Sequence, residues 1–324
     1  GMIFYLFMYY TICYPSSVII QNSRDNFMEI MKLLNLPKPS PEFISWFMGF
    51  SEGDGSFIRA KRGDLYFIIT QDSQDIHILY YMQEQLGFGK VIKQGQTTHR
   101  YIVQNNLELY LMALLFNGSI KLPSKLRDYM GFVEDTNMKI FKGKFSRKLN
   151  TNNTRDREIL SLIKPIDIMK TTSSLTLTDF WLAGFIDAEG CFYINMNMNN
   201  SLKTNTLKYN MTFDINQKSL ENKHIFYQLI SLFKVGRMYN HQAVNNYYYR
   251  IMGLNNLLVL INYLEVYPLK TQKFKSYLLW LDIFKKIKEM KTLNKKMEYK
   301  DLLELKSTSQ CMNNKKDQRI GKKV

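Results

Sequence analysis

Cysteine and histidine are both scarce in this chain of 324 residues. The three cysteines (Cys13, Cys191 and Cys311) lie far apart and form no CxxC pair, so neither a zinc site nor a disulfide framework is indicated. The four histidines show no metal-binding spacing and form no triad with a marked serine or cysteine. A lone histidine is far more often structural or solvent-facing than catalytic.

Acidic residues are few relative to basic ones, with 28 Asp and Glu against 44 Lys and Arg and a formal net charge of +16. This balance favours a polyanionic partner, nucleic acid first and an anionic membrane surface second. Hydrophobic residues make up 45% of the chain, which is enough for a sizeable core, and the length suits roughly two domains. Plentiful Asn, Lys, Ile, Tyr and Phe with little Ala are typical of an AT-rich genome, which predicts an organellar, specifically mitochondrial, localisation.

The first twenty residues contain no charge. They lack both the basic start of a secretory signal and the arginines of an organelle transit peptide. Thr11, Pro15 and two serines interrupt the apolar run, which weakens the case for a membrane span. We interpret residues 1–39 as an N-terminal extension whose role the sequence does not define, and a membrane role stays open.

A segment of twelve residues occurs twice, as WFMGFSEGDGSF at 46–57 and WLAGFIDAEGCF at 181–192. Five positions are identical, and an acid is retained where Asp54 pairs with Glu189. One copy alone would be a helix with a glycine at its C-terminal end, but two copies with retained acids indicate more than a cap. The repeat predicts a first domain at 40–135, a linker at 136–178, and a second domain with C-terminal helices at 179–324.

Both motifs are predicted to be helices, beginning at Ser40-Pro41-Glu42 and at Thr178-Asp179. Small residues four positions apart would let the two helices approach closely. These residues are Gly49 and Gly53 in the first helix, and Gly184 and Ala188 in the second. Asp54 and Glu189 would then meet at two negative helix ends, where each carboxylate is disfavoured by a few tenths to about 1 kcal/mol. A divalent cation is the natural compensation.

Strands with period-two alternation are predicted after each motif, and they are clearest after the second. Their outward faces carry amides, hydroxyls, aromatics and basic residues, which suit hydrogen bonds to base edges in a major groove. An ordinary solvated sheet face is the alternative. The residues expected to contact nucleic acid are Ser56, Arg62, Thr70, Lys90 and Arg100 in the first half, and Tyr193, Asn195, Asn197, Asn199, Asp214, Asn216, Arg237 and Tyr239 in the second.

Two further residue pairs repeat between the halves. Gln71 and Gln217 each end the second predicted strand, and Lys125 in SKLRDY matches Lys273 in QKFKSY. A surface glutamine or lysine is ordinarily unremarkable, so only the repetition draws attention to these four side chains.

The motifs FMGFSEGDG and LAGFIDAEG resemble the signature of the LAGLIDADG homing endonucleases, and the duplication and strand pattern extend the resemblance over most of residues 40–290. It implies an α+β fold of two pseudo-symmetric αββαββα repeats in one chain. Each repeat would present a saddle-shaped antiparallel sheet to duplex DNA, and the two motif helices would pack together at the centre.

The resemblance also assigns roles to residues at the end of each motif helix. In that family the eighth motif residue binds the catalytic metal, which implies this role for Asp54 and Glu189. The remaining implied site residues are the carbonyls of Gly53 and Ala188 at the metal, Gln71 and Gln217 at the polar position, and Lys125 and Lys273 at the basic position. The first motif departs from the family pattern at Ser51-Glu52, where a hydrophobic residue and Asp are usual, but this departure does not touch the metal-binding position.

The activity implied by the resemblance is site-specific double-strand cleavage of DNA with Mg2+, for which Mn2+ can substitute, leaving staggered ends. Because both motifs lie in one chain, we expect a monomer with no obligate protein partner on a long non-palindromic site. The alternatives are a maturase that binds its own intron RNA, either alone or beside nuclease activity, and a DNA-binding regulator. The two retained acids favour the nuclease.

Overall fold

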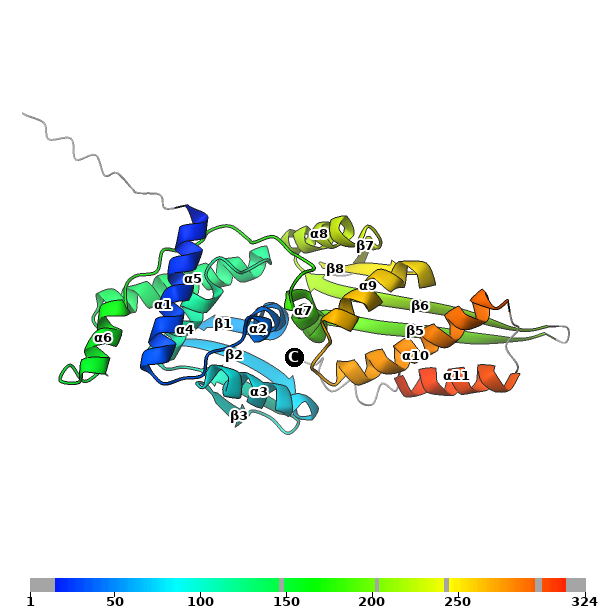
Figure 1. Cartoon of the computed structure of the whole chain (residues 1–324), viewed down its shortest axis with the longest axis horizontal. Helices are drawn as coiled ribbons and strands as arrows, with labels where there is room; N and C mark the ends of the chain where they lie inside the picture. The colour runs from blue at the N-terminus through cyan, green and yellow to red at the C-terminus, as the bar shows by residue number, and fades with distance from the viewer. Residues whose placement is uncertain (1–14, 146–148, 202–203, 242–244, 295–298, 313–324) are drawn as a thin grey trace, which may run out of the picture.

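Two halves with one order of elements make up the protein (Figure 1). The structure is a computed structural model that describes residues 15–145, 149–201, 204–241, 245–294 and 299–312. The first half contains α2 (Pro41–Asp54), β1 (Gly55–Arg59), β2 (Leu65–Asp72), the 3-10 turn η1 (Ser73–Asp75), α3 (Ile76–Leu86), β3 (Lys90–Lys93), β4 (Thr98–Val103), α4 (Asn106–Phe116) and α5 (Pro123–Phe141). The second contains α7 (Trp181–Glu189), β5 (Gly190–Ser201), β6 (Thr204–Lys218), η2 (Leu220–Asn222), α8 (Lys223–Phe233), β7 (Arg237–His241), β8 (Asn246–Met252), α9 (Leu254–Val266), α10 (Lys273–Thr292) and α11 (Tyr299–Met312). The predicted pair of αββαββα repeats is confirmed.

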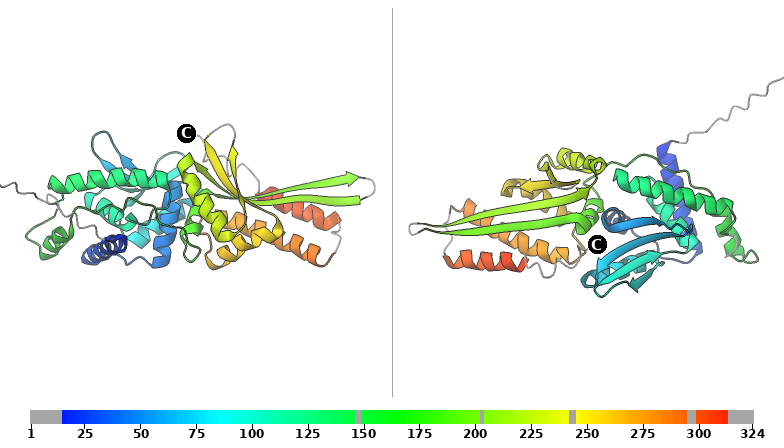
Figure 2. Two further views of the ribbon diagram at one scale, coloured as in Figure 1. Left: turned by 90° about the horizontal axis from the view of Figure 1, so that it is seen from above. Right: turned by 180° about the vertical axis from the view of Figure 1, so that it is seen from behind.

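Each half folds around one four-stranded antiparallel sheet. The strand order is β1-β2-β4-β3 in the first sheet and β5-β6-β8-β7 in the second. Strands β5 and β6 pair from Gly190 opposite Ile215 to Ser201 opposite Thr204, and they project as a long ribbon away from the centre (Figure 2). The two sheets therefore have the same strand order, but β5 and β6 are longer than β1 and β2.

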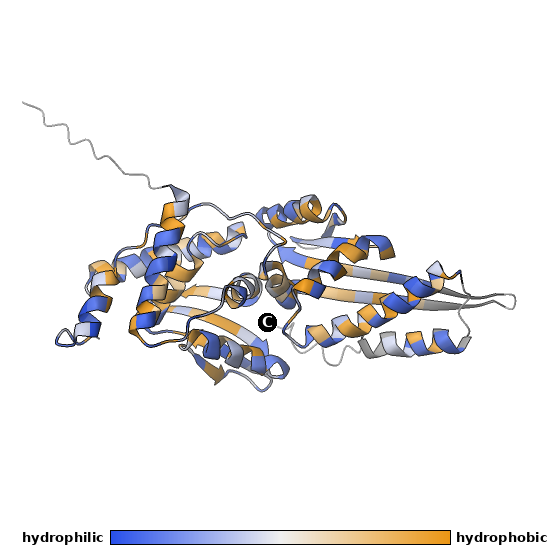
Figure 3. Ribbon diagram, viewed as in Figure 1, coloured by the Kyte–Doolittle hydropathy of each residue, from blue (hydrophilic) through white to orange (hydrophobic). Residues whose placement is uncertain are grey.

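One face of each sheet is buried under helices. In β5, Phe192 and Ile194 are buried, whereas the alternating Tyr193 and Asn195 are exposed. Figure 3 shows hydrophobic stretches along the strands and on the helices that cover them. The period-two pattern of the sequence is confirmed, and the outward faces are left to polar residues.

Equivalent aromatic side chains fill the two cores. In the first half Phe57 packs against Phe67 and Phe132, at ring-centroid distances of 5.2 Å each. In the second half Phe192 lies 5.2 Å from Phe213 and 5.4 Å from Trp280 in the same arrangement. Buried aromatic side chains contribute much of the stability of such cores.

Two further helices belong to the first half. Helix α1 (Ser16–Leu33) packs on α4 and on α6 (Thr154–Leu162), with Phe27 and Ile30 fully buried. Residues 16–33 of the expected N-terminal extension are thus part of this core, and α5 runs past the expected boundary at 135. Among the described residues, no helix is both long and apolar enough to cross a membrane.

The two motif helices begin differently. Ser40 caps α2, because its Oγ accepts from the backbone N of Phe43 at 3.1 Å. Helix α7 begins only at Trp181, whose N donates to Asp179 Oδ1 at 2.9 Å. The expected start at Thr178-Asp179 is therefore two residues too early, although Asp179 accepts from the first N–H of the helix.

Helices α2 and α7 pack backbone to backbone at the centre of the molecule (Figure 1). A Cβ atom added to Gly49 would lie 1.8 Å from the carbonyl oxygen of Trp181, and one added to Gly184 would lie 2.0 Å from that of Trp46. No side chain fits at such distances, so the close approach requires glycine at both positions. This confirms that small residues four apart mark the contact.

Replacing Gly49 or Gly184 with Ala is expected to destabilise the protein by more than the roughly 1–3 kcal/mol typical of overpacking, because the obstacle is main chain. Thermal melting measures the effect. Gly95→Ala is the matched control, since Gly95 is exposed and an added Cβ meets only Thr98 Oγ1 at 3.0 Å. A Gly49→Ala protein that melts with the control would contradict the packing.

Candidate active site and nucleic-acid interface

A buried acid on each motif helix binds the opposite helix and its own half. Glu52 accepts from Trp181 Nε1 at 2.9 Å through Oε2, and from the N atoms of Lys121 and Leu122 at 2.8 Å each through Oε1. Its residue exposure is 2%. A single carboxylate therefore joins α7 to the segment that leads into α5.

Asp187 makes the mirror-image set of bonds. Its Oδ2 accepts from Trp46 Nε1 at 2.9 Å and from Lys270 N at 2.8 Å, and its Oδ1 accepts from Thr271 Oγ1 at 2.6 Å and Thr271 N at 3.1 Å. Each motif tryptophan thus donates to the acid of the other helix. Glu52, which stands where the family pattern has Asp, makes the same kind of bonds with a longer side chain.

Burial raises the pKa of Glu52 to about 7, against the lowering effect of its backbone and tryptophan donors and of nearby Lys121. Burial also raises the pKa of Asp187, again opposed by its hydrogen bonds. The fold fixes the donors that surround both acids. Glu52 and Asp187 therefore hold helices α2 and α7 in register. Sequence reasoning did not assign this role, although both acids and both tryptophans repeat in the motif.

Glu52→Gln is expected to destabilise the protein by about 1–3 kcal/mol, because the new amide would place N–H groups against a buried N–H donor. Trp181 Nε1 is that donor. Urea denaturation of the metal-free protein measures the change. An unaltered unfolding midpoint would show that the bond to Trp181 does not hold the interface.

Asp54 and Glu189 end their helices side by side, as the sequence predicted. A Cβ on Gly53 would lie 2.4 Å from Ala188 Cβ and 3.1 Å from Glu189 Cγ. The carboxylates therefore extend from backbones that almost touch. Each of them lies at the negative end of a helix, where an acid is electrostatically unfavourable.

Gln71 binds the first of these acids. Its Nε2 donates to Asp54 Oδ2 at 2.7 Å from the end of β2. Burial raises the pKa of Asp54 to about 6, and the bond from Gln71 followed by the charges of Lys273 and Lys125 acts in the opposite direction. The hydrogen bond from Gln71 therefore favours the ionised form of Asp54.

Two lysines bind carbonyl groups at the C-terminal ends of the motif helices. Lys273 Nζ donates to the carbonyls of Ile186 and Asp187 at 2.8 Å each, and Lys125 Nζ donates to the carbonyl of Gly55. Positive charge at a helix C-terminus is favourable. The structure thus places both predicted lysines beside the acid pair.

Both lysines interact electrostatically with the acid pair. Lys273 and then Lys125 lower the pKa of Asp54. Burial lowers the pKa of Lys125, and the nearby acids oppose this in the order Glu52, Asp128, Glu189 and Asp54.

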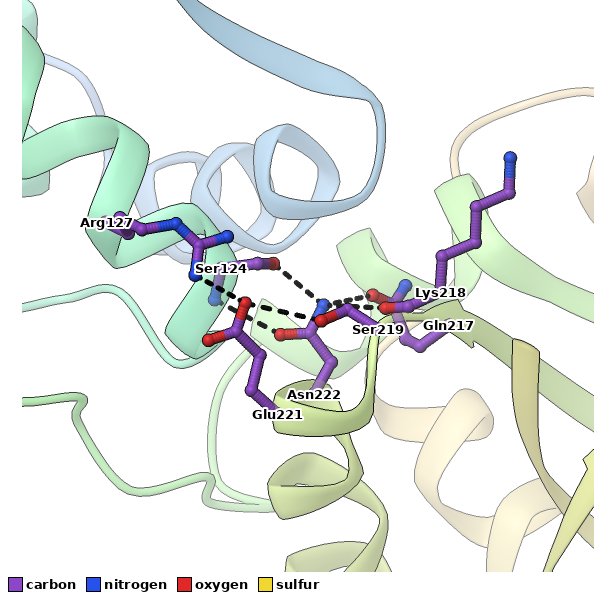
Figure 4. Close-up of polar contacts among 7 residues, drawn as sticks. All are labelled: Ser124, Arg127, Gln217, Lys218, Ser219, Glu221 and Asn222. Atoms are coloured by element: carbon purple, nitrogen blue, oxygen red, sulfur yellow. Dashed lines mark hydrogen bonds and ion pairs between the residues drawn. The ribbon is translucent and has the colours of Figure 1, made fainter. Parts of the chain in front are cut away.

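Gln217 differs from its counterpart Gln71. It is buried, and its Oε1 accepts from Asn222 Nδ2 at 3.1 Å (Figure 4). Asn222 was not singled out from the sequence, and no motif marks it. The two predicted glutamines thus lie at equivalent strand ends but have different partners.

The outward face of the first sheet carries the predicted contacts in accessible positions. Ser56, Thr70 and Lys90 are exposed, and Arg100 is half-buried with its Nε donating to Gln94 Oε1. Arg62 is exposed in the turn between β1 and β2 rather than on a strand. This face mixes hydroxyl groups with basic groups.

The outward face of the second sheet carries most of the remaining predictions. Tyr193, Asn195 and Arg237 are exposed, and Asn216 and Tyr239 are half-buried. The side chains of Asn197 and Asn199 lie outside the described residues, and only their backbones are placed in β5.

The expectation that Asp214 reads base edges is wrong. Asp214 is 3% exposed, and its two oxygens accept from Arg250 Nε and Nη2 at 2.6 and 2.5 Å. The Arg250 guanidinium also lies 4.8 Å from the ring centre of Tyr248 and 5.8 Å from that of Tyr239. Asp214 therefore holds the guanidinium of Arg250, which the sequence did not single out, in place on this face.

The donor set at the helix ends suits a hard divalent cation. Mg2+ commonly takes one or two carboxylates, keeps several waters and uses substrate phosphates as further ligands. Asp54 and Glu189 supply two carboxylates, and the described residues contain no group of three or more His, Cys, Asp or Glu that could hold a metal ion. The pair therefore fits a metal shared with a phosphodiester.

Comparison with known proteins identifies the family. The sequence profile of the LAGLIDADG endonuclease family matches residues 47–136 and 182–284. The two matches begin within α2 and α7 and together cover more than half of the chain. The chain belongs to the LAGLIDADG endonuclease family.

Relatives and solved structures agree with this assignment. The chain is 32% identical over 253 residues to "Probable intron-encoded endonuclease 4" of Neurospora crassa. This match covers 77% of this chain and 41% of that protein. It is 26% identical over 259 residues to an uncharacterized cox1 intron-2 protein of Schizosaccharomyces pombe. This match covers 79% of this chain and 70% of that protein. The chain thus spans less than half the length of the first of these relatives.

The fold matches the crystal structure of the meganuclease I-SmaMI bound to uncleavable DNA, with a TM-score of 0.64 and 19% sequence identity. The match covers 84% of this chain and 97% of that chain. Two repeats in one chain are therefore common to both proteins.

Proposed function

We propose that this chain is a metal-dependent endonuclease that cleaves both strands of duplex DNA at a specific site. The observation that carries the proposal is the meeting of Asp54 and Glu189 at the ends of α2 and α7. Two carboxylates at adjacent negative helix ends repel one another unless a cation lies between them. The DNA bound to I-SmaMI and the name of the Neurospora crassa relative support the same reading.

Mg2+, or Mn2+ in its place, would be held by Asp54, Glu189 and the carbonyls of Gly53 and Ala188, and would polarise the scissile phosphate and activate a water molecule. Gln71, which already donates to Asp54, would orient the water. No histidine base is needed in this chemistry.

Lysines 125 and 273 would offset the negative charge that develops on the phosphate under attack. Their amino groups lie at the ends of the motif helices, within reach of the acid pair. With one acid supplied by each half, the two strands are cut at staggered positions across the minor groove.

The two sheets would lie along one continuous duplex, with their polar faces in the major groove. Because the halves differ in sequence, the target is long and non-palindromic, and the chain acts as a monomer. Arg250 is the strongest candidate for base reading in the second half, since arginine held in a fixed orientation pairs well with guanine. The intron names of relatives support an organellar, mitochondrial setting.

Splicing assistance through intron RNA is the alternative activity. RNA binding alone requires no carboxylate pair at the helix ends, so the retained acids favour cleavage. Both activities in one chain are compatible with this site.

Glu189→Gln is expected to abolish double-strand cleavage while leaving the metal-free protein at least as stable as the wild type. The substitution removes like-charge repulsion and an unfavourable helix-end charge, each worth a few tenths to about 1 kcal/mol. It also removes a charged metal ligand. The measurements are thermal melting, DNA affinity in Ca2+, and cleavage in Mg2+ of a duplex selected by the wild type from a randomised library.

Two results would contradict the proposal. One is wild-type cleavage of that duplex in excess EDTA, and the other is a Glu189→Gln protein that cuts both strands at the wild-type rate. Glu52→Gln is the contrasting control, because the same chemical change in α2 removes a buried structural bond and lowers stability instead.

A further inference from the structure

A hydrogen-bonded joint connects the end of β6 to the start of α5 across the two halves (Figure 4). Asn222, which is 3% exposed, donates through Nδ2 to Ser124 Oγ at 2.8 Å and to Gln217 Oε1 at 3.1 Å. Its Oδ1 accepts from Ser124 N at 3.2 Å. Because the backbone N of Ser124 can only donate, the amide orientation of Asn222 is defined by its surroundings.

An ion pair flanks this joint without touching its centre. Arg127 Nη1 lies 2.7 Å from Glu221 Oε1, which also accepts from Ser219 Oγ at 3.3 Å. The Arg127 side chain is 67% exposed, and exposed pairs contribute only about 0–1 kcal/mol. The geometry of the joint therefore depends on Asn222.

Asn222 links Gln217 to the residue that precedes Lys125. Gln217 comes from the second half, and Ser124 immediately precedes Lys125 in the first half. The amide thus holds the start of the helix that carries one lysine, and at the same time holds the glutamine of the other half.

A matching joint exists on the other side of the pseudo-symmetry axis. Asp75, at the end of η1, accepts from Gln272 N at 2.8 Å through Oδ1, and Gln272 Nε2 donates to the carbonyl of Gln74 at 3.4 Å. Gln272 immediately precedes Lys273. Asp75 ends the short 3-10 turn η1, which follows β2 and its residue Gln71. The first half therefore holds the lysine-bearing helix of the second.

We propose that Asn222 and Asp75 are positioning residues, each of which fixes the start of the lysine-bearing helix of the opposite half. Asn222 also binds Gln217, the glutamine of its own half. Every reaction centre is then a composite of both halves, with Gln71 and Lys273 at one phosphate and Gln217 and Lys125 at the other. The inference deepens the proposed nuclease function and rests on it.

This arrangement predicts strand-specific effects, which a general loosening of the interface would not produce. Each joint serves one centre and therefore one DNA strand. Loss of the Asn222 contacts should slow one strand, and loss of the Asp75 contact should slow the other. The two variants should accumulate nicked duplexes of opposite polarity.

The test uses the full chain and the duplex selected by the wild type, with a different fluorophore on each strand. Asn222→Ala is expected to slow one strand about 10–100-fold relative to the other, which is the scale of misplacing a reacting group by about an ångström. Asp75→Ala should slow the other strand, and Asp75→Asn, which keeps an acceptor for Gln272 N, should restore the wild-type strand ratio. Affinity for the duplex in Ca2+ should stay close to that of the wild type for every variant.

Glu221→Gln is the matched control, because it weakens the exposed pair with Arg127 and leaves Ser124 and Gln217 bonded; its strand ratio should equal that of the wild type. If Asn222→Ala does not fold, the Asp75 variants decide alone, since only one side-chain bond is lost from a half-buried position. Equal slowing of both strands, or slowing of the same strand by both alanine variants, overturns this inference and leaves the nuclease intact. A wild type that cuts no duplex overturns the proposed function and the inference with it.

Discussion

The whole molecule depends on one steric constraint, the contact of two helix backbones at Gly49 and Gly184. Nothing larger than hydrogen fits where each glycine faces a tryptophan carbonyl of the other helix. Once the helices lie this close, their C-terminal ends lie side by side, and Asp54 and Glu189 project into one small volume. The contact thus fixes the distance between the two halves and the composition of the site together.

The cost of bringing two acids to two negative helix ends is offset by polar bonds, both across the interface and within each half. Trp46 and Trp181 donate to buried acids on the opposite helix, and lysines cover the terminal carbonyls. These bonds fix the position of the two motif helices. The structure therefore holds the carboxylates of Asp54 and Glu189 close together at the two helix ends.

The sequence predicted the parts of this design that repeat. The duplicated motif located both helices, both acids and the small residues between them, and the period-two pattern located both buried sheet faces. It could not reveal contacts between residues far apart in the chain, such as Asn222 with Ser124 or Arg250 with Asp214. Asp214 was misread for this reason, since alternation gives the face of a strand residue but says nothing of a neighbour that buries it.

The central claim is that the two halves build one metal-binding centre from an acid of each. Crystals of the protein with its selected duplex and Mn2+ test this directly through anomalous scattering. The account predicts a Mn2+ peak bonded to both Asp54 and Glu189, at the roughly 2.0–2.6 Å typical of hard cations and carboxylate oxygens. A metal bound to one acid alone, with the other turned away from it, would contradict the account.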